Sequence, residues 1–97
     1  MHYDFEWDPA KARENRRRHG VSFEQAAELF ADPMARSLFD AEHSAPEETR
    51  WITLGRAMNG QPLIVVHTFE ETGERAIVRI ISARLATRHE QDAYEER

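Results

Sequence analysis

The pattern of apolar and polar positions predicts a strand followed by a helix at the start of the chain. Residues 2–7 alternate polar and aromatic side chains, as a short strand does. A helix is expected from Pro9 to about His19. Asp8 can cap this helix, proline suits its first turn, and Gly20 can end it in a left-handed conformation.

A second helix and a run of strands are predicted to follow. Ser22 can cap the helix, whose apolar positions recur at helical spacing. These positions are Phe23, Ala26, Ala27 and Phe30. Later segments show the alternating or β-branched pattern of strands. They cover residues 35–40, 50–58, 61–69 and 76–81. Ser82 is expected to cap a last helix from Ala83 to about Glu95.

The predicted element order is β-α-α-β-β-β-β-α. Consecutive strands without intervening helices indicate an α+β fold, in which helices pack on one side of an antiparallel sheet. A chain of 97 residues has room for one modest core. A single domain is therefore expected over residues 1–97.

Asn59-Gly60 separates two of the predicted strands and is typical of a two-residue hairpin turn. Such a turn would place Arg56 opposite Leu63. In that register, His67 shares a sheet face with Arg50 and Arg56. Both faces of the hairpin carry apolar residues, so the sequence leaves open which face the helices cover.

Charge is distributed unevenly along the chain. The net charge of −5 and the pI near 5.5, taken alone, argue against a nucleic-acid binder. Residues 11–19 nevertheless hold Lys11 and four arginines against Glu14 alone. The acidic residues gather in residues 1–8, 40–48 and 70–74 and at the C-terminus. We expect the acidic parts to face a basic partner and the basic parts to face an anion.

The composition also bounds the compartment and the cofactors. The absence of cysteine excludes disulfides and thiolate metal sites and suits a reducing cytoplasm. No apolar stretch approaches the ~20 residues of a membrane span, and the N-terminus lacks the pattern of a signal peptide. The spacing of His2, His43 and His89 predicts no metal site. We expect a cytoplasmic protein without membrane contact.

Arg16, Arg17, Arg18 and His19 close the first predicted helix. A dense cationic cluster beside a titratable imidazole suits RNA, because breaking an RNA phosphodiester needs charge stabilisation and proton transfer but no metal. The same residues also fit a solvated helix face whose histidine caps the last carbonyls. Both interpretations stay open at this point.

Several short segments, which follow one another along essentially the whole chain, together form a recognisable pattern. The segments are Phe5-Glu6-Trp7-Asp8, Asn15, Arg18-His19-Gly20-Val21-Ser22-Phe23, Asp32-Pro33, His43-Ser44, Arg50-Trp51, Leu54-Gly55-Arg56, Arg79-Ile80-Ile81-Ser82-Ala83-Arg84, Ala86, Glu90 and Tyr94. Together they resemble the BrnT family, the toxin half of a bacterial type II toxin–antitoxin system. The resemblance implies a RelE-like ribonuclease fold and RNA cleavage that needs no metal or other cofactor and inhibits translation. It also implies neutralisation by a BrnA-like ribbon-helix-helix antitoxin, through which alone the toxin would contact operator DNA.

Three residues are candidates for catalysis. His19 is the candidate for proton transfer, because imidazole titrates nearest to neutral pH. Arg79 and Arg84 are candidates for contacts to the scissile phosphate, and Arg84 lies at the expected start of the last helix, where free N–H groups also bind phosphate. The alternative for Arg84 is an ion pair with Glu90 that holds this helix to the sheet. We expect the arginines to converge on one anion-sized pocket open to solvent.

Further candidates would guide the RNA. They are Arg16, Arg17, Arg18, Arg50, Arg56 and His67. A hydrogen-bonded strand histidine explains His67 at least as well. Trp51 is expected to pack in the core, and stacking on a base is the alternative if its sheet face is open.

Two other functions fit parts of the sequence. The chain is alternatively a non-catalytic interaction module that binds a DNA-binding partner and co-regulates its operon, which the low pI favours. Direct DNA binding through the second helix is weaker, because that helix carries Glu24 and Glu28 and no basic residue.

Overall fold

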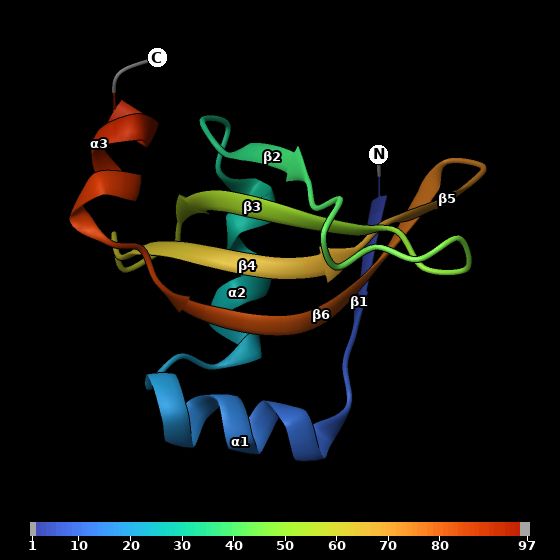
Figure 1. Ribbon diagram of the computed structural model, residues 1–97, viewed down its shortest axis with the longest axis horizontal. Helices are drawn as coiled ribbons and strands as arrows, with labels where there is room; N and C mark the ends of the chain where they lie inside the picture. The colour runs from blue at the N-terminus through green and yellow to red at the C-terminus, as the bar shows by residue number, and fades with distance from the viewer. Residues whose placement is uncertain (1, 96–97) are drawn as a thin grey trace.

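The computed structural model describes residues 2–95, which form a six-stranded sheet and three α-helices (Figure 1). The strands are β1 (His2–Glu6), β2 (Arg36–Phe39), β3 (Arg50–Arg56), β4 (Pro62–Thr68), β5 (Glu70–Thr72) and β6 (Arg75–Leu85). The helices are α1 (Pro9–His19), α2 (Phe23–Ala27) and α3 (Arg88–Glu95), and a 3₁₀ turn, η1 (Glu28–Ala31), follows α2 directly. None of these described helices has both the length and the apolar character that crossing a bilayer requires.

The sheet has the strand order β1-β6-β4-β3-β2, and β5 pairs with β6. The predicted α+β class is confirmed, and the pairs among β2, β3, β4 and β6 are antiparallel as expected. β1 departs from the expectation because it pairs with β6 in parallel, with Phe5 beside Val78. Parallel neighbours need a long connection, which the helices and strands between β1 and β6 supply. The sheet is therefore mixed.

The β3–β4 hairpin turns through three residues instead of two. The Gly60 N–H donates to the Ala57 carbonyl (2.9 Å), and Gly60 has a left-handed φ of 87°. A tight turn followed by one left-handed residue is a common three-residue hairpin loop. Arg56 consequently pairs with Pro62 and not with Leu63. The predicted register is wrong by one residue, and such a slip exchanges the faces of β4 relative to β3.

The last helix begins later than predicted. β6 stays paired with β4 as far as Leu85, so α3 starts only at Arg88. Thr87, and not Ser82 as predicted, is the residue that caps the N-terminus of this helix. Glu90 N–H donates to the Thr87 hydroxyl (3.2 Å), and Thr87 N–H donates to the Glu90 carboxylate (2.8 Å). This reciprocal capping box fixes the first turn of α3.

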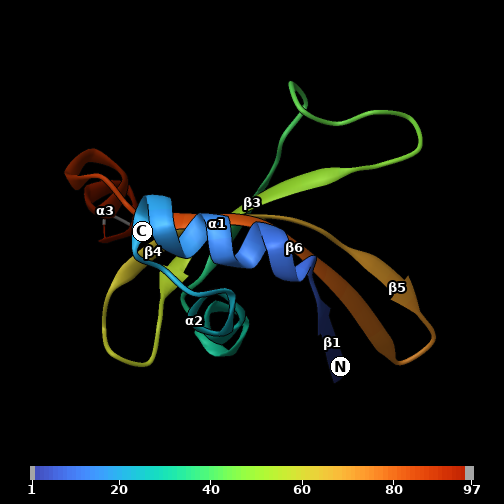
Figure 2. The same cartoon turned by 90° about the horizontal axis from the view of Figure 1, so that it is seen from below.

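The two faces of the sheet differ in what covers them. α2 and η1 pack against one face, which we call the covered face (Figure 2). Buried side chains of the covered face and of α2 and η1 form the core. They include Phe23, Ala26, Leu29, Leu63, Val65, Val78, Ile80 and Ala83. The opposite face, which we call the open face, points toward the viewer in Figure 1, with α3 at one end of it. It carries Ile52, Leu54, Ile64 and Val66.

A buried amide side chain docks α1 to the edge of the sheet. The Asn15 Nδ2 donates to the carbonyls of Val21 (3.0 Å) and Ala83 (2.8 Å), and its Oδ1 accepts the Ala83 N–H (3.0 Å). Asn15 thereby takes the place of a neighbouring strand along the part of β6 that β1 does not reach. Buried backbone groups need such partners, so α1 is tied to β6 by polar contacts as well as by packing.

Replacement of Asn15 by alanine should lower the free energy of unfolding by about 3 kcal/mol, because it leaves buried backbone groups of Val21 and Ala83 without partners. Urea denaturation measures the loss. Arg13→Ala removes an exposed side chain from the same helix and should change the free energy by less than about 0.5 kcal/mol. Equal stability of Asn15→Ala and the wild type would contradict the docking role of Asn15.

Candidate functional site

The arginines predicted as phosphate or RNA contacts on the strands share the open face. Arg50 and Arg56 lie on β3, and Arg79 and Arg84 lie on β6. The pairings of β3 with β4 and of β4 with β6 fix the orientation of each strand. Because side chains alternate along a strand, these pairings place all four arginines on this face.

A β-bulge is necessary for this arrangement. Arg79 and Arg84 are an odd number of positions apart, so a regular strand would point them to opposite faces. β6 contains one extra residue, Ile81, between its pairings with His67 and with Val66. The extra residue reverses the alternation, and Arg84 returns to the face of Arg79.

The arginines do not converge on one pocket, contrary to the expectation from the sequence. Arg79 and Arg84 are four β4 residues apart in register, which is roughly 13 Å between backbones at ~3.3 Å per strand residue, and their side chains bind different carboxylates. Each arginine lies beside its own carboxylate. The pairs are Arg50–Glu48 (2.8 Å), Arg56–Glu95 (3.0 Å), Arg79–Glu6 (3.6 Å) and Arg84–Glu90 (2.8 Å). The open face therefore presents a row of ion-paired arginines.

Arg84 and Glu90 form a bidentate pair. Both terminal nitrogens of Arg84 donate to the carboxylate, at 2.8 and 2.9 Å. This pair is the main reason why the pKa of Glu90 falls to about 2, against the opposing effect of its partial burial. Arg84 thus makes the ion pair that was the alternative to a phosphate contact, and it lies in β6 and not at a helix N-terminus.

Arg79 lies in an acidic hollow of about 440 Å³ at the other end of the open face. The hollow is lined by Glu6, Glu47, Glu48, Thr49, Thr68, Phe69 and Glu70 together with Arg79. Carboxylates outnumber the single guanidinium, so the hollow is negative in sum and repels a phosphate. A phosphate contact at Arg79 therefore requires that acidic side chains move aside.

The cationic cluster lies on α1, at the edge of the sheet that β6 forms. Arg16, Arg17 and Arg18 are all exposed. Arg17 forms an ion pair with Glu14 on the preceding turn, which raises the pKa of Arg17. The cluster is therefore an exposed cationic helix end, which is compatible with both interpretations, RNA contact and a solvated helix face.

His19 is exposed and lies beside the bulged segment of β6. It lines a hollow of about 190 Å³ between α1 and β6. The other lining residues are Lys11, Glu14, Asn15, Arg18, Ile81 and Ser82. Ser82 shares the open face with Arg84, because β6 alternates regularly after the bulge. The hollow of His19 therefore adjoins the end of the open face that carries Arg84.

His67 lies on the covered face, so its predicted grouping with Arg50 and Arg56 is wrong. The ring is buried and both nitrogens are bonded. Nδ1 donates to the Thr68 carbonyl (2.9 Å), and Nε2 accepts the Thr53 hydroxyl (2.6 Å). Burial lowers the pKa of His67 more than the bond to Thr68 raises it, so the ring is neutral. This is the hydrogen-bonded strand histidine of the alternative interpretation.

Two further histidines make local polar contacts. His2 lies 3.6 Å from the Asp4 carboxylate, and His43 Nδ1 lies 2.9 Å from the Asp40 carboxylate. Within residues 2–95, no three histidine, aspartate or glutamate side chains are grouped so that they could share a metal ion.

The sequence matches a family model over residues 7–90, and the family is described as the ribonuclease toxin, BrnT, of type II toxin–antitoxin systems. This chain belongs to the BrnT family. Membership makes it one of the ribonuclease toxins and implies a cognate antitoxin as its partner. No curated protein matches the chain.

The fold of this BrnT-family chain is similar to that of a solved relative, the Brucella abortus ribonuclease toxin BrnT, whose crystal structure has a resolution of 1.1 Å. The TM-score is 0.59 at 19% sequence identity, over 91% of this chain and 100% of that chain. At this identity the likeness supports the fold alone.

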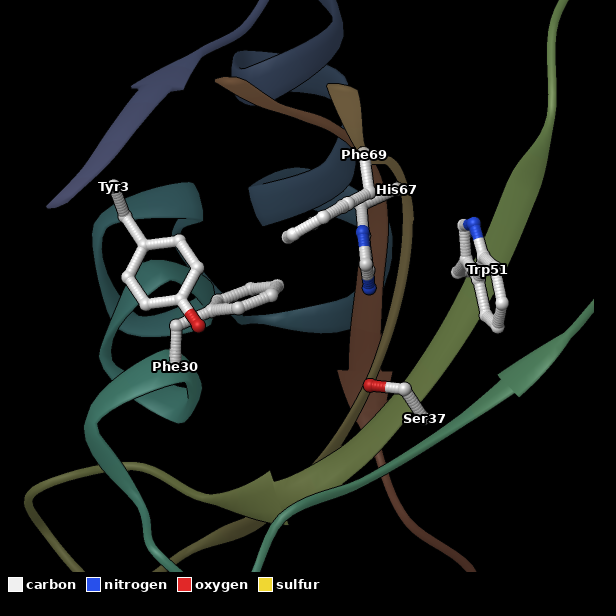
Figure 3. Close-up of a pocket in the computed structure, with 6 residues that line it drawn as sticks. All are labelled: Tyr3, Phe30, Ser37, Trp51, His67 and Phe69. Atoms are coloured by element: carbon white, nitrogen blue, oxygen red, sulfur yellow. The ribbon is translucent and has the colours of Figure 1, made fainter. Parts of the chain in front are cut away.

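The BrnT-family chain also contains an aromatic pocket that the sequence did not reveal (Figure 3). The pocket has a volume of about 270 Å³ and is lined by Tyr3, Phe30, Ser37, Trp51, His67 and Phe69. Trp51 therefore faces a cavity open to solvent and is only half-buried. The correct hairpin register would have placed Trp51 beside His67, but Tyr3 and Phe30 come from distant parts of the chain.

Asp32 has a structural role that could not be predicted from the sequence. Its carboxylate accepts the N–H of Arg56 (2.8 Å), the N–H of Met34 (2.9 Å) and the Tyr94 hydroxyl (2.9 Å). Burial alone would raise the pKa of Asp32, but these donors lower it below its usual value. Asp32 thereby joins the end of η1 to the edge of β3 and to α3, next to Arg56.

The Arg84–Glu90 pair should make stability depend on pH in the acid range. The pKa of Glu90 is lowered from 4.5 to about 2, so its stabilising effect is present above about pH 4.5 and is lost as the pH falls toward 2. Urea denaturation at a series of pH values should show that the wild type loses stability more steeply over this range than Glu90→Gln does. Glu24→Gln removes an exposed carboxyl from α2 and should follow the wild type. Parallel curves for Glu90→Gln and the wild type would contradict the assignment.

Proposed function

We propose that this toxin is an endoribonuclease that binds RNA along the open face and cleaves it without a metal. The observation that carries the proposal is the common face of Arg50, Arg56, Arg79 and Arg84, which adjoins the hollow of His19. A row of separated cations suits the regularly spaced phosphates of a nucleic acid better than it suits one small anion.

The carboxylate partners leave these arginines usable. Exposed ion pairs contribute only about 0–1 kcal/mol, so a phosphate can displace a glutamate from a half-exposed guanidinium. Arg79 is held loosely, with 3.6 Å to its partner, and its side chain is 45% exposed. Arg84 is bonded through two nitrogens, but its side chain is still 42% exposed. In the RNA complex, phosphate oxygens take the positions that the glutamate oxygens occupy in the free toxin.

The proposed reaction is an attack of the ribose 2′-oxygen on the adjacent phosphorus, with departure of the 5′-oxygen. His19 moves one of the two protons, either from the attacking hydroxyl or to the leaving oxygen, and water accepts or donates the other. Arg84, which lies at the end of the open face next to the hollow of His19, stabilises the negative charge that develops on the phosphorane. Arg79 contacts another phosphate further along the RNA. Arg16, Arg17, Arg18, Arg50 and Arg56 guide the RNA backbone toward this site.

In the cell, the proposed toxin is cytoplasmic and inhibits translation by cutting RNA. A ribbon-helix-helix antitoxin neutralises it in a heterotetramer and supplies the contacts to operator DNA. The ion-paired state of Arg50, Arg56, Arg79 and Arg84 favours one alternative, a non-catalytic module that acts only by binding its partner.

Arg84→Ala should reduce cleavage of purified total RNA by about 10²–10³-fold, because one preorganised cation at the developing charge is lost. His19→Ala should reduce it by about 10²-fold or more. Cleavage by the wild type should be unchanged in EDTA. The measurement is the initial rate of fragment formation, with the fold of each variant checked by circular dichroism.

Arg88→Ala is the matched control, since it removes an arginine of α3 that is 88% exposed and should keep full activity. Glu90→Gln separates the two roles of Arg84. If Arg84 contacts phosphate, Glu90→Gln should retain or increase activity. If Arg84 only holds α3 in place, Glu90→Gln should lose activity, as Arg84→Ala does. Equal cleavage by Arg84→Ala and the wild type would discard Arg84. A wild type that neither cleaves RNA nor arrests growth on induction would establish the binding module instead.

A further inference from the structure

β2 presents an apolar strand edge to solvent. Every residue of β2 is exposed, and Leu38 and Phe39 leave 65% and 53% of their surface uncovered. β2 ends the strand order, so none of the strands formed by residues 2–95 lies along its outer edge (Figure 1). Soluble proteins usually protect such edges with charges, prolines or covering segments, because an open edge pairs with other chains. Arg36 places one charge on this short edge, but Leu38 and Phe39 leave its second half apolar and uncovered, which indicates a place where another chain pairs.

The pairing of β2 with β3 shows which backbone groups are available. The Asp40 N–H donates to the Arg50 carbonyl (2.9 Å), so the hydrogen-bonded pairs with β3 recur at Leu38. The N–H and C=O groups of Ser37 and Phe39 consequently point away from β3. Donors and acceptors two residues apart are what an added strand requires.

The aromatic pocket opens beside this same edge. Ser37 lines the pocket, and Phe39 packs on Trp51, another lining residue, with 5.7 Å between ring centres. A residue of an added strand opposite Ser37 would point toward the covered face, with its Cβ about 5 Å from that of Ser37, at the mouth of the pocket. A cavity of about 150 Å³ already accepts benzene. The pocket, at about 270 Å³, therefore has room for a large apolar side chain.

The charge beside the edge favours a basic occupant. The loop of residues 40–49 follows β2 and exposes Glu42 and Glu47, and it also exposes Glu48, which is ion-paired with Arg50. The whole chain carries a net charge of −5, so two copies repel each other while a basic segment is attracted.

We propose that β2 accepts an extended segment of the antitoxin as an added strand. An aromatic or large aliphatic residue of this segment enters the aromatic pocket, and flanking basic residues face the loop of residues 40–49. The proposal takes its partner from the toxin–antitoxin family and does not depend on RNA cleavage. The open face lies on the other side of the sheet, so this contact holds the antitoxin without occupying the row of arginines.

The test uses the full toxin and the protein encoded by the reading frame adjacent to the toxin gene. Phe39→Lys places a charge on the edge and should weaken their binding at least tenfold in isothermal titration calorimetry. Met58→Lys introduces the same charge at an exposed loop position, 86% exposed, and should bind within twofold of the wild type. In the wild-type complex, amide hydrogen exchange should slow at Ser37 and Phe39. This second measurement decides the question if Phe39→Lys fails to fold.

Unchanged binding by a folded Phe39→Lys, or no slowing of exchange at Ser37 and Phe39 in the complex, would overturn the proposal. Slowed exchange in the toxin alone, together with a dimer mass, would overturn it in favour of a second copy on the edge. Both measurements report binding and not RNA cleavage. A toxin that binds at β2 but cuts no RNA would contradict only the proposed function.

Discussion

The β-bulge at Ile81 is the constraint on which the proposed site depends. Without the extra residue, β6 would point Arg84 into the covered face, where the apolar core has no place for a guanidinium. The Asn15 side chain bonds both backbone groups of Ala83, two residues beyond the bulge, and so holds the bulged segment against α1. The same short stretch therefore sets the face of Arg84 and the position of α1, which carries His19.

The ion pairs on the open face explain how a protein with a negative net charge can bind a polyanionic substrate. A net charge of −5 disfavours nonspecific attraction of nucleic acid, and carboxylates close to each arginine reduce it further. The arginines remain half-exposed, so a ligand that offers several phosphates at the right spacing can replace several carboxylates together. Affinity then depends on the arrangement of the row more than on total charge. The acidic hollow around Arg79 marks one end of this row, and the hollow of His19 marks the other.

Much of the fold could be predicted from the sequence, and the errors have local causes. Caps and apolar spacing located α1 and the start of α2 correctly, and Asn59-Gly60 located the hairpin. The predicted hairpin register was wrong because Gly60 alone takes the left-handed position of a three-residue loop. The dipeptide Asn59-Gly60 does not show whether the loop has two or three residues. The late start of α3 depends on pairing between β4 and β6, which no local pattern shows. Because of the three-residue loop, His67 lies on the covered face, and because of the late start of α3, Arg84 lies in a strand. The aromatic pocket could not be predicted because its residues come from segments far apart in the sequence.

The most direct test of the RNA-binding face is NMR mapping of the free toxin titrated with an oligonucleotide that lacks the attacking 2′-hydroxyl and is therefore not cleaved. We expect the largest chemical-shift changes at the amides of Ile52, Leu54, Val66 and Ser82 and at the Nε signal of Arg84, all on the open face. Changes confined to the covered face, around Trp51 and Phe69, would contradict the assignment of RNA to the row of arginines.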